Sequence, residues 1–102
     1  MIAKTILQQI GGHRFVLMTG SRDFTDLGNG LLMSLAKNMT SANRLEILYD
    51  EDEDLYNMRF YRKTFSKKTF ESKTKDIAKY EGVYFDMLEF IFKEVTGLNT
   101  RL

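Results

Sequence analysis

Residues 44–61, RLEILYDEDEDLYNMRFY, contain the clearest indication of the fold. The first half of this stretch alternates apolar and polar side chains, with Leu45 and Ile47 on one side, and its second half repeats the pattern with Met58 and Phe60. A period of two is typical of a strand that buries one face. An unbroken run of acidic residues separates the two halves. The stretch therefore predicts an antiparallel hairpin with an acidic tip.

Upstream of the hairpin, short apolar segments are separated by glycine-containing turns. Residues 2–10 place apolar side chains three and four apart, which predicts a short helix that ends at Gly11-Gly12. The run FVLM, residues 15–18, is too short for a helix, and we expect it to form a buried strand. A polar loop then leads to Asn29-Gly30, a dipeptide typical of tight turns, and to a further strand over residues 31–36.

Downstream of the hairpin, residues 63–79 are polar and basic, and the one strand that we expect there lies around residues 76–80. Apolar residues from Val83 to Val95 recur in an i, i+1, i+4, i+5 rhythm, which predicts an amphipathic helix that ends at Gly97. The order of elements predicts a single α+β domain over residues 1–102. It combines a short N-terminal helix, four or five antiparallel strands and a C-terminal helix, with both helices on one face of the sheet.

Composition excludes several classes of protein. The chain has 102 residues, with no Cys, no Pro and one His. The lack of Cys excludes disulfide frameworks and thiolate chemistry, and the single His excludes sites that need two imidazoles. Apolar runs are far shorter than the roughly 20 residues that span a bilayer. We therefore expect a cytoplasmic protein with no membrane partner.

Two segments match known chemistry only in part. Asp50, Asp52 and Asp54 have the alternate spacing of an EF-hand loop, but Leu55 stands where that loop requires Gly, and Tyr61 stands where it requires Glu. The single His lies near a Ser and an Asp, but no G-x-S-x-G elbow positions them. We therefore expect no metal site, no cofactor and no catalytic residue, and we interpret the protein as a binder rather than an enzyme.

Charge is distributed unevenly along the chain. The formal net charge is +1, from 15 basic and 14 acidic side chains. Residues 46–54 contain six acidic and no basic side chains, whereas residues 59–79 contain eight basic and two acidic ones. Near-neutrality therefore hides two segments of opposite charge, an arrangement that favours binding over catalysis.

Aromatic residues are interleaved with the basic segment 59–79. Cations that hold phosphates and aromatic rings that stack bases suit a single-stranded nucleic acid. A solvent-facing hairpin also places basic residues outside and aromatics inside, so the pattern alone does not decide between the two interpretations. Our leading hypothesis is a nucleic-acid-binding protein whose phosphate contacts come from Arg59, Arg62, Lys63, Lys67 and Lys68.

A second hypothesis is a protein-binding module, either a modulator of a host protein or an assembly subunit. Phe85 and Phe90 widen the apolar arc of the C-terminal helix beyond what one sheet face covers. Exposure of both rings would favour a protein partner or a homodimer. The acidic hairpin tip offers such a module a second contact surface.

Four segments resemble a family of small phage and prophage proteins. They are GGHRFVLMTGSRDF (11–24), GNGLLMSLAKN (28–38), DLYNMRFYR (54–62) and GVYFDMLEFIFKEVTGLNTRL (82–102). In the last segment, the matching residues are Tyr84, Asp86, Leu88, Thr96, Gly97 and Leu98. The chain departs from the family pattern at Ser21-Arg22-Asp23, where the resemblance leads us to expect a small residue, Lys and Asn.

This resemblance implies expression inside a bacterial host from a mobile genome. No established activity, cofactor or site residue comes with this resemblance. Combined with the basic segment, it predicts a small non-enzymatic phage or prophage accessory protein that binds nucleic acid, which is an argument by analogy.

Overall fold

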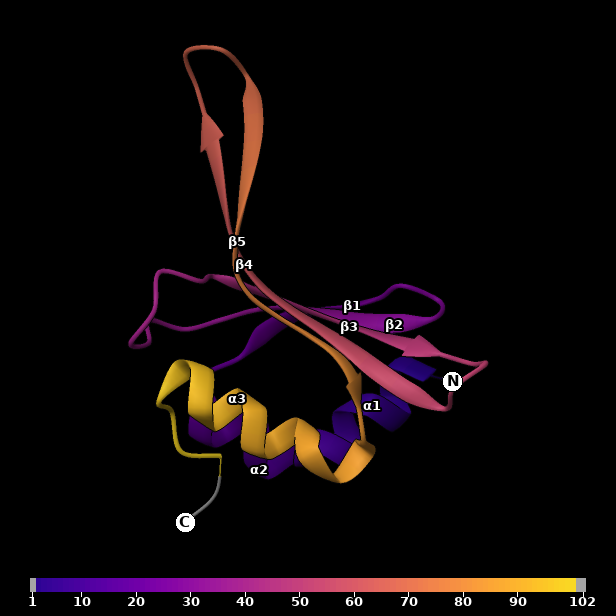
Figure 1. Ribbon diagram of the computed structural model, residues 1–102. Coiled ribbons are helices and arrows are strands. Elements are labelled where there is room, and N and C mark those ends of the chain that lie inside the picture. The colour runs from indigo at the N-terminus through magenta and orange to yellow at the C-terminus, as the bar shows by residue number, and fades with distance from the viewer. Residues whose placement is uncertain (1, 101–102) are drawn as a thin grey trace.

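The sheet is an antiparallel meander in which each strand pairs with its neighbours in the chain (Figure 1). The computed structural model describes residues 2–100. In sheet order, the strands are β1 (Arg22–Asp26), β2 (Gly30–Ser34), β3 (Arg44–Asp50), β4 (Leu55–Ser66) and β5 (Glu71–Val83). The helices are α1 (Ile2–Ile10), α2 (Gly12–Thr19) and α3 (Leu88–Thr96), with the 3-10 turn η1 (Phe85–Met87) before α3. The predicted α+β fold with an antiparallel sheet is confirmed.

The helices cover one face of the sheet, and the core lies between these two layers (Figure 1). The aromatic centre of this core is Phe92 of α3, whose ring centroid lies 4.7 Å from that of Phe15 in α2 and 6.3 Å from that of Phe60 in β4. On the apolar face of β3 and β4, the side chains of Leu45, Ile47, Met58 and Phe60 are buried, and that of Tyr49 is half-buried. Of the helices in residues 2–100, none has the length and apolar character to cross a bilayer.

The prediction of a strand over residues 15–18 is wrong, because these residues belong to α2. Phe15 is fully buried whereas Leu17 is 70% exposed, so the run buries one side of a helix. The first helix, α1, ends at Ile10 as predicted, and a second helix, α2, begins at Gly12, with Gly11 between the two. Gly11 takes φ +136°, and a Cβ there would lie 2.8 Å from the Cβ of Phe15. Glycine therefore allows a tight corner between α1 and α2. The strand was predicted wrongly because an apolar run of four residues is too short to show whether its period is that of a strand or of a helix.

Several other elements also differ from those predicted. The strand predicted over residues 31–36 is β2 and ends at Ser34, and β4 continues past Tyr61 to Ser66. The polar loop after residue 20 contains the edge strand β1, and β5 extends from Glu71 to Val83 rather than only around residues 76–80. The C-terminal helix begins at Leu88 rather than near Val83, because Val83 completes β5 and η1 turns the chain toward the helical layer. For β1 and β5, pairing with a neighbouring strand outweighs the local sequence signal, which is weak in polar segments.

Candidate nucleic-acid interface

The most exposed part of the molecule is the distal half of the β4–β5 hairpin, residues 62–75, which we call the arm. The pairing of β3 with β4 reaches its end at Arg44 and Tyr61, whereas β4 and β5 continue to pair as far as Ser66 and Glu71. The arm is therefore a two-stranded ribbon. Figure 1 shows it rising from the sheet on the side away from the helices.

A β-bulge at the base of the arm explains its direction. Phe60 pairs with Ala78 and Tyr61 pairs with Asp76, so Ile77 is an extra residue on β5. A bulge of this kind bends the strands and increases their twist. The ribbon consequently leaves the plane of the sheet at the point where β3 no longer supports it.

The side chain of Asn43 clamps the base of the arm. Its Nδ2 donates to the carbonyl oxygen of Lys63 over 2.9 Å, and its Oδ1 accepts from the Lys63 backbone N–H over 2.8 Å. The Asn43 backbone N–H also donates to the carbonyl oxygen of Tyr61 over 3.0 Å. The Asn43 side chain thus bonds the backbone of β4 as a residue of a neighbouring strand would, and these bonds fix the point at which the ribbon begins.

The arm concentrates positive charge. It contains six basic side chains and one acidic side chain, while the rest of the chain contains nine basic and thirteen acidic ones. The net charge of +1 therefore divides into +5 on the arm and −4 elsewhere. Every side chain from residue 62 to 75 is exposed except Ser66, which is half-buried. Nothing in the arm builds a core, so its residues are available to a ligand.

One side of the ribbon carries three cations, Arg62, Lys73 and Lys75, together with Thr64. We call these four residues the basic face. The register places Arg62 opposite Lys75 and Thr64 opposite Lys73. The four side chains, with Thr74, line a shallow hollow of about 300 Å³. Like charges directly opposite one another destabilise a hairpin. Within residues 2–100, no ion pair joins any arm cation to a carboxylate, so an external anion would relieve this repulsion.

The five predicted phosphate-binding residues fall into two groups. Arg62, Lys63, Lys67 and Lys68 lie in the arm, the last two in its terminal turn. Arg62 uses Nη1 to donate to the carbonyl oxygen of Ser41 over 3.0 Å, which orients its guanidinium and leaves its other N–H groups for a ligand.

Arg59 belongs to the second group, because its charge is already paired. Its Nε lies 2.6 Å from Oδ1 of Asp76, and its guanidinium carbon lies 4.1 Å from the ring centroid of Tyr61. The hydrogen bond to Asp76 raises the pKa of this guanidinium. Arg59 therefore braces the base of the arm, below the ribbon itself. The sequence prediction omitted Lys73 and Lys75, whose positions opposite Thr64 and Arg62 become clear only from the strand register.

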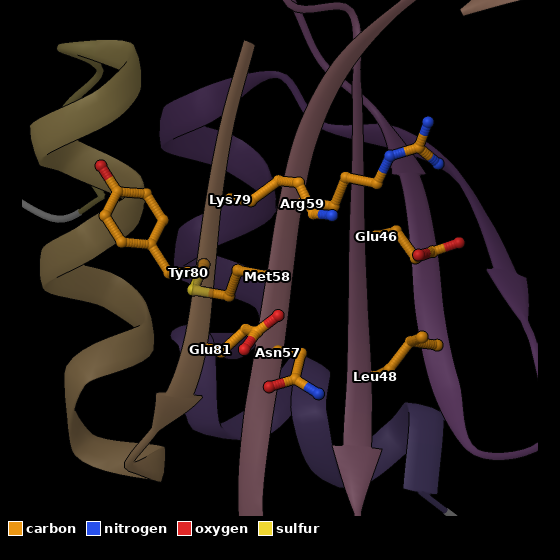
Figure 2. A pocket seen from close by; sticks show the side chains of 8 residues that line it. All are labelled: Glu46, Leu48, Asn57, Met58, Arg59, Lys79, Tyr80 and Glu81. Carbon is orange, nitrogen blue, oxygen red and sulfur yellow. The ribbon is translucent and has the colours of Figure 1, made fainter. Parts of the chain in front are cut away.

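The outer face of the sheet, next to the arm, carries balanced charges. Figure 2 shows the hollow of about 210 Å³ that β3, β4 and β5 form there. Strand register places Glu46, Arg59 and Lys79 in one row across the sheet, and Glu81 also lines the hollow. Two carboxylates oppose two cations at this site. A polyanion would therefore be attracted far more strongly by the arm than by this hollow.

The acidic tip, residues 50–54, lies at the other end of β4 from the arm. Oδ1 of Asp50 accepts from the backbone N–H groups of Asp52 and Glu53, over 3.1 Å and 3.3 Å. The Tyr49 hydroxyl donates to Oδ1 of Asp54 over 2.6 Å, and this bond raises the pKa of Tyr49 to about 12. The tip carboxylates thus order their own turn, and β4 has opposite charges at its two ends.

Phe85 and Phe90 lie on the helical layer and not on the arm. Their side chains are 58% and 57% exposed. Phe90 lines a hollow together with Asp86 and Lys93, so both signs of charge stand beside the exposed ring. Both rings are therefore exposed, which favours binding of a protein partner or of a second copy of the chain.

The chain matches no protein-family model, no curated protein and no solved structure at a significant level. The resemblance to small phage proteins therefore stays a prediction, and the function is inferred from the geometry of the arm.

Proposed function

We propose that the protein is a non-enzymatic binding protein whose arm holds single-stranded nucleic acid through its phosphates. The main support for this proposal comes from the basic face, where Arg62 and Lys75 lie opposite each other in an exposed ribbon. An isolated two-stranded ribbon is only marginally stable in water, and like charges weaken it further. Selection for stability does not account for such a ribbon, whereas binding of a polyanion does.

The charge division supports the same proposal. With a net charge of +5 on the arm and −4 elsewhere, a phosphate backbone is attracted to the arm and repelled from the acidic tip. Guanidinium and ammonium groups bind phosphate oxygens with charge-assisted hydrogen bonds. The resemblance to small phage proteins is consistent with an accessory role inside a bacterial host cell, where viral nucleic acid is the ligand.

Removal of the basic face tests the proposal. In the triple variant Arg62→Gln, Lys73→Gln, Lys75→Gln, we expect affinity for a fluorescently labelled oligothymidylate to fall at least about tenfold at low salt, because three phosphate contacts are lost. Fluorescence anisotropy measures this affinity.

A matched control separates the basic face from net charge. The triple variant Lys4→Gln, Lys37→Gln, Lys93→Gln removes three exposed cations outside the arm and changes the net charge equally. We expect this variant to bind nearly as well as the unaltered protein. An equal loss in both variants, or no binding by the unaltered protein to single-stranded DNA or RNA, would contradict the proposal.

A second candidate function is assembly through the α3 face, favoured by the exposure of Phe85 and Phe90. Asp86 and Lys93 stand beside Phe90, so two copies related by a two-fold axis could pair opposite charges around the rings. Sedimentation velocity tests this function. A dimer that dissociates in the double variant Phe85→Ser, Phe90→Ser supports it, and a monomer at high protein concentration rejects it.

A further inference from the structure

Two aromatic rings meet at the end of the arm and remain open to solvent. A four-residue turn, residues 67–70, joins Ser66 of β4 to Glu71 of β5. Phe70 is 80% exposed and Phe65 is 57% exposed. Their ring centroids lie 6.5 Å apart with the planes inclined by 65°. The pair is far from the core and packs against itself.

Phe70 adopts a backbone conformation that is unusual for a phenylalanine. Its φ is +56°, in the left-handed region that bulky side chains rarely adopt. The acidic hairpin provides a comparison within the same chain, since residues 51–54 also form a four-residue turn and its last residue, Asp54, has φ +55°. Asp, Asn and Gly tolerate this conformation, whereas it is sterically unfavourable for Phe. Neither turn geometry nor burial therefore explains an aromatic ring at position 70.

A nucleobase explains both the ring and its surroundings. Lys67 and Lys68 lie in the same turn, so cations stand beside the exposed aromatic surface. Proteins that bind single strands combine these two features, because the cations hold phosphates while the rings stack bases. Bases in a duplex are already stacked on one another, which leaves unpaired bases as the ones that such a pair can accept.

We infer that Phe65 and Phe70 form a stacking site for an unpaired base at the tip of the arm. This inference rests on the proposed binding of nucleic acid, and it adds that the protein recognises bases as well as phosphates. Phe70 supplies the more exposed ring, and Phe65 holds it from β4.

Two oligomers of equal length and charge test the inference. One is oligothymidylate, and the other is an abasic sugar-phosphate chain. We expect the unaltered protein to bind the oligothymidylate roughly tenfold or more tightly, since stacking of bases on the aromatic rings adds to the phosphate contacts that both oligomers make. In Phe70→Asn, this preference should be lost while affinity for the abasic chain is unchanged, because Asn fits the left-handed backbone of the turn.

A fluorescent variant tests the contact itself. The chain contains no Trp, so Phe70→Trp introduces a single indole at the tip and preserves an aromatic surface. We expect saturating oligothymidylate to quench its fluorescence strongly and the abasic chain to leave it nearly unchanged. In the matched variant Phe90→Trp, which places the indole on α3, neither oligomer should have an effect.

The outcomes separate the stacking site from the proposed function. If the unaltered protein binds both oligomers equally well, or if Phe70→Trp fluorescence does not respond to saturating oligothymidylate, the stacking site is rejected and phosphate binding stands. If neither oligomer binds at low salt, both the stacking site and the proposed function are rejected.

Discussion

At the scale of single residues, Phe92 joins the two layers of the molecule. It is fully buried and contacts rings from α2 and from β4. We predict that Phe92→Ala lowers the free energy of unfolding by about 3–5 kcal/mol, because it leaves a cavity where three elements meet. Urea unfolding followed by circular dichroism measures this loss.

Phe90, on the opposite side of the same helix, is the matched control. Because its ring is 57% exposed, Phe90→Ala should change the free energy of unfolding by no more than about 0.5 kcal/mol. Similar losses in the two variants would contradict the burial of Phe92 and the exposure of Phe90.

The hydrogen bond between Tyr49 and Asp54 makes the stability of the protein depend on pH in the alkaline range. The hydrogen bond to Asp54 raises the pKa of Tyr49 from 10.0 to about 12, so the folded state holds the phenolic proton more tightly than the unfolded state does. The resulting stabilisation is fully present below pH 10.0 and is lost as the pH rises through about 12. We predict that Asp54→Asn shifts one tyrosine ionisation back toward pH 10.0, as measured by absorbance at alkaline pH.

The same substitution also affects Tyr56, to a smaller extent. Burial is the main cause that raises the pKa of Tyr56 and it persists in Asp54→Asn, whereas the repulsion from the Asp54 carboxylate is lost, so the Tyr56 ionisation should shift less than that of Tyr49. Asn also tolerates the left-handed backbone at position 54, so the turn keeps its shape. Identical titration curves for the variant and the unaltered protein would show that the hydrogen bond does not form in solution.

Burial of single residues in the hairpin was predictable from the sequence, and the composition of the basic face was not. Leu45, Ile47 and Phe60 are buried as their alternation predicts, because the pleat of a strand alone decides which side each residue takes. The pairing of Lys75 with Arg62 depends on where the ribbon turns. Polar residues on both sides of the turn gave no alternation from which that point could be located.

At the scale of elements, the arm depends on the Asn43 clamp. Asn43→Ala removes the acceptor for the Lys63 backbone N–H and the donor to its carbonyl oxygen. A hydrogen bond contributes about 1 kcal/mol to stability, so we predict that the Lys63 amide exchanges roughly five- to tenfold faster in this variant. Amide hydrogen exchange followed by NMR measures this rate, and the core amides of β3 should keep their protection.

Asn43→Asp refines this prediction. Asp keeps an oxygen that accepts from the Lys63 backbone N–H but loses the Nδ2 donor. Lys63 should therefore stay more protected in Asn43→Asp than in Asn43→Ala. Unchanged exchange in Asn43→Ala would mean that the clamp does not hold the arm.

Elements differ in how far the sequence reveals them. The helix over residues 2–10 and the hairpin over residues 44–61 were predictable, because each repeats its apolar pattern long enough to identify the period. Residues 15–18 were assigned to the wrong class, since a run of four apolar residues fits either a strand or a helix. Only the part of β5 around residues 76–80 was predicted, because its other polar residues pair with β4 through backbone hydrogen bonds, which side-chain patterns do not encode.

At the scale of the whole molecule, β4 separates two poles of charge. Its 12 residues run from the acidic tip to the arm, and the molecule is 42 Å long in its greatest dimension. A single strand of nucleic acid would approach the arm end first and leave the acidic end free. Binding by this mechanism is electrostatic, and it must weaken as salt replaces the displaced counterions.

The salt dependence of oligonucleotide binding tests whether the arm cations bind phosphates. Each phosphate that a protein neutralises on a single strand contributes about −0.7 to the slope of log affinity against log salt concentration. If the six arm cations each neutralise one phosphate, the slope for oligothymidylate is about −4, and the Arg62→Gln, Lys73→Gln, Lys75→Gln variant has a slope about 2 units shallower. A slope that is near zero, or one that the three substitutions leave unchanged, would contradict binding through the arm.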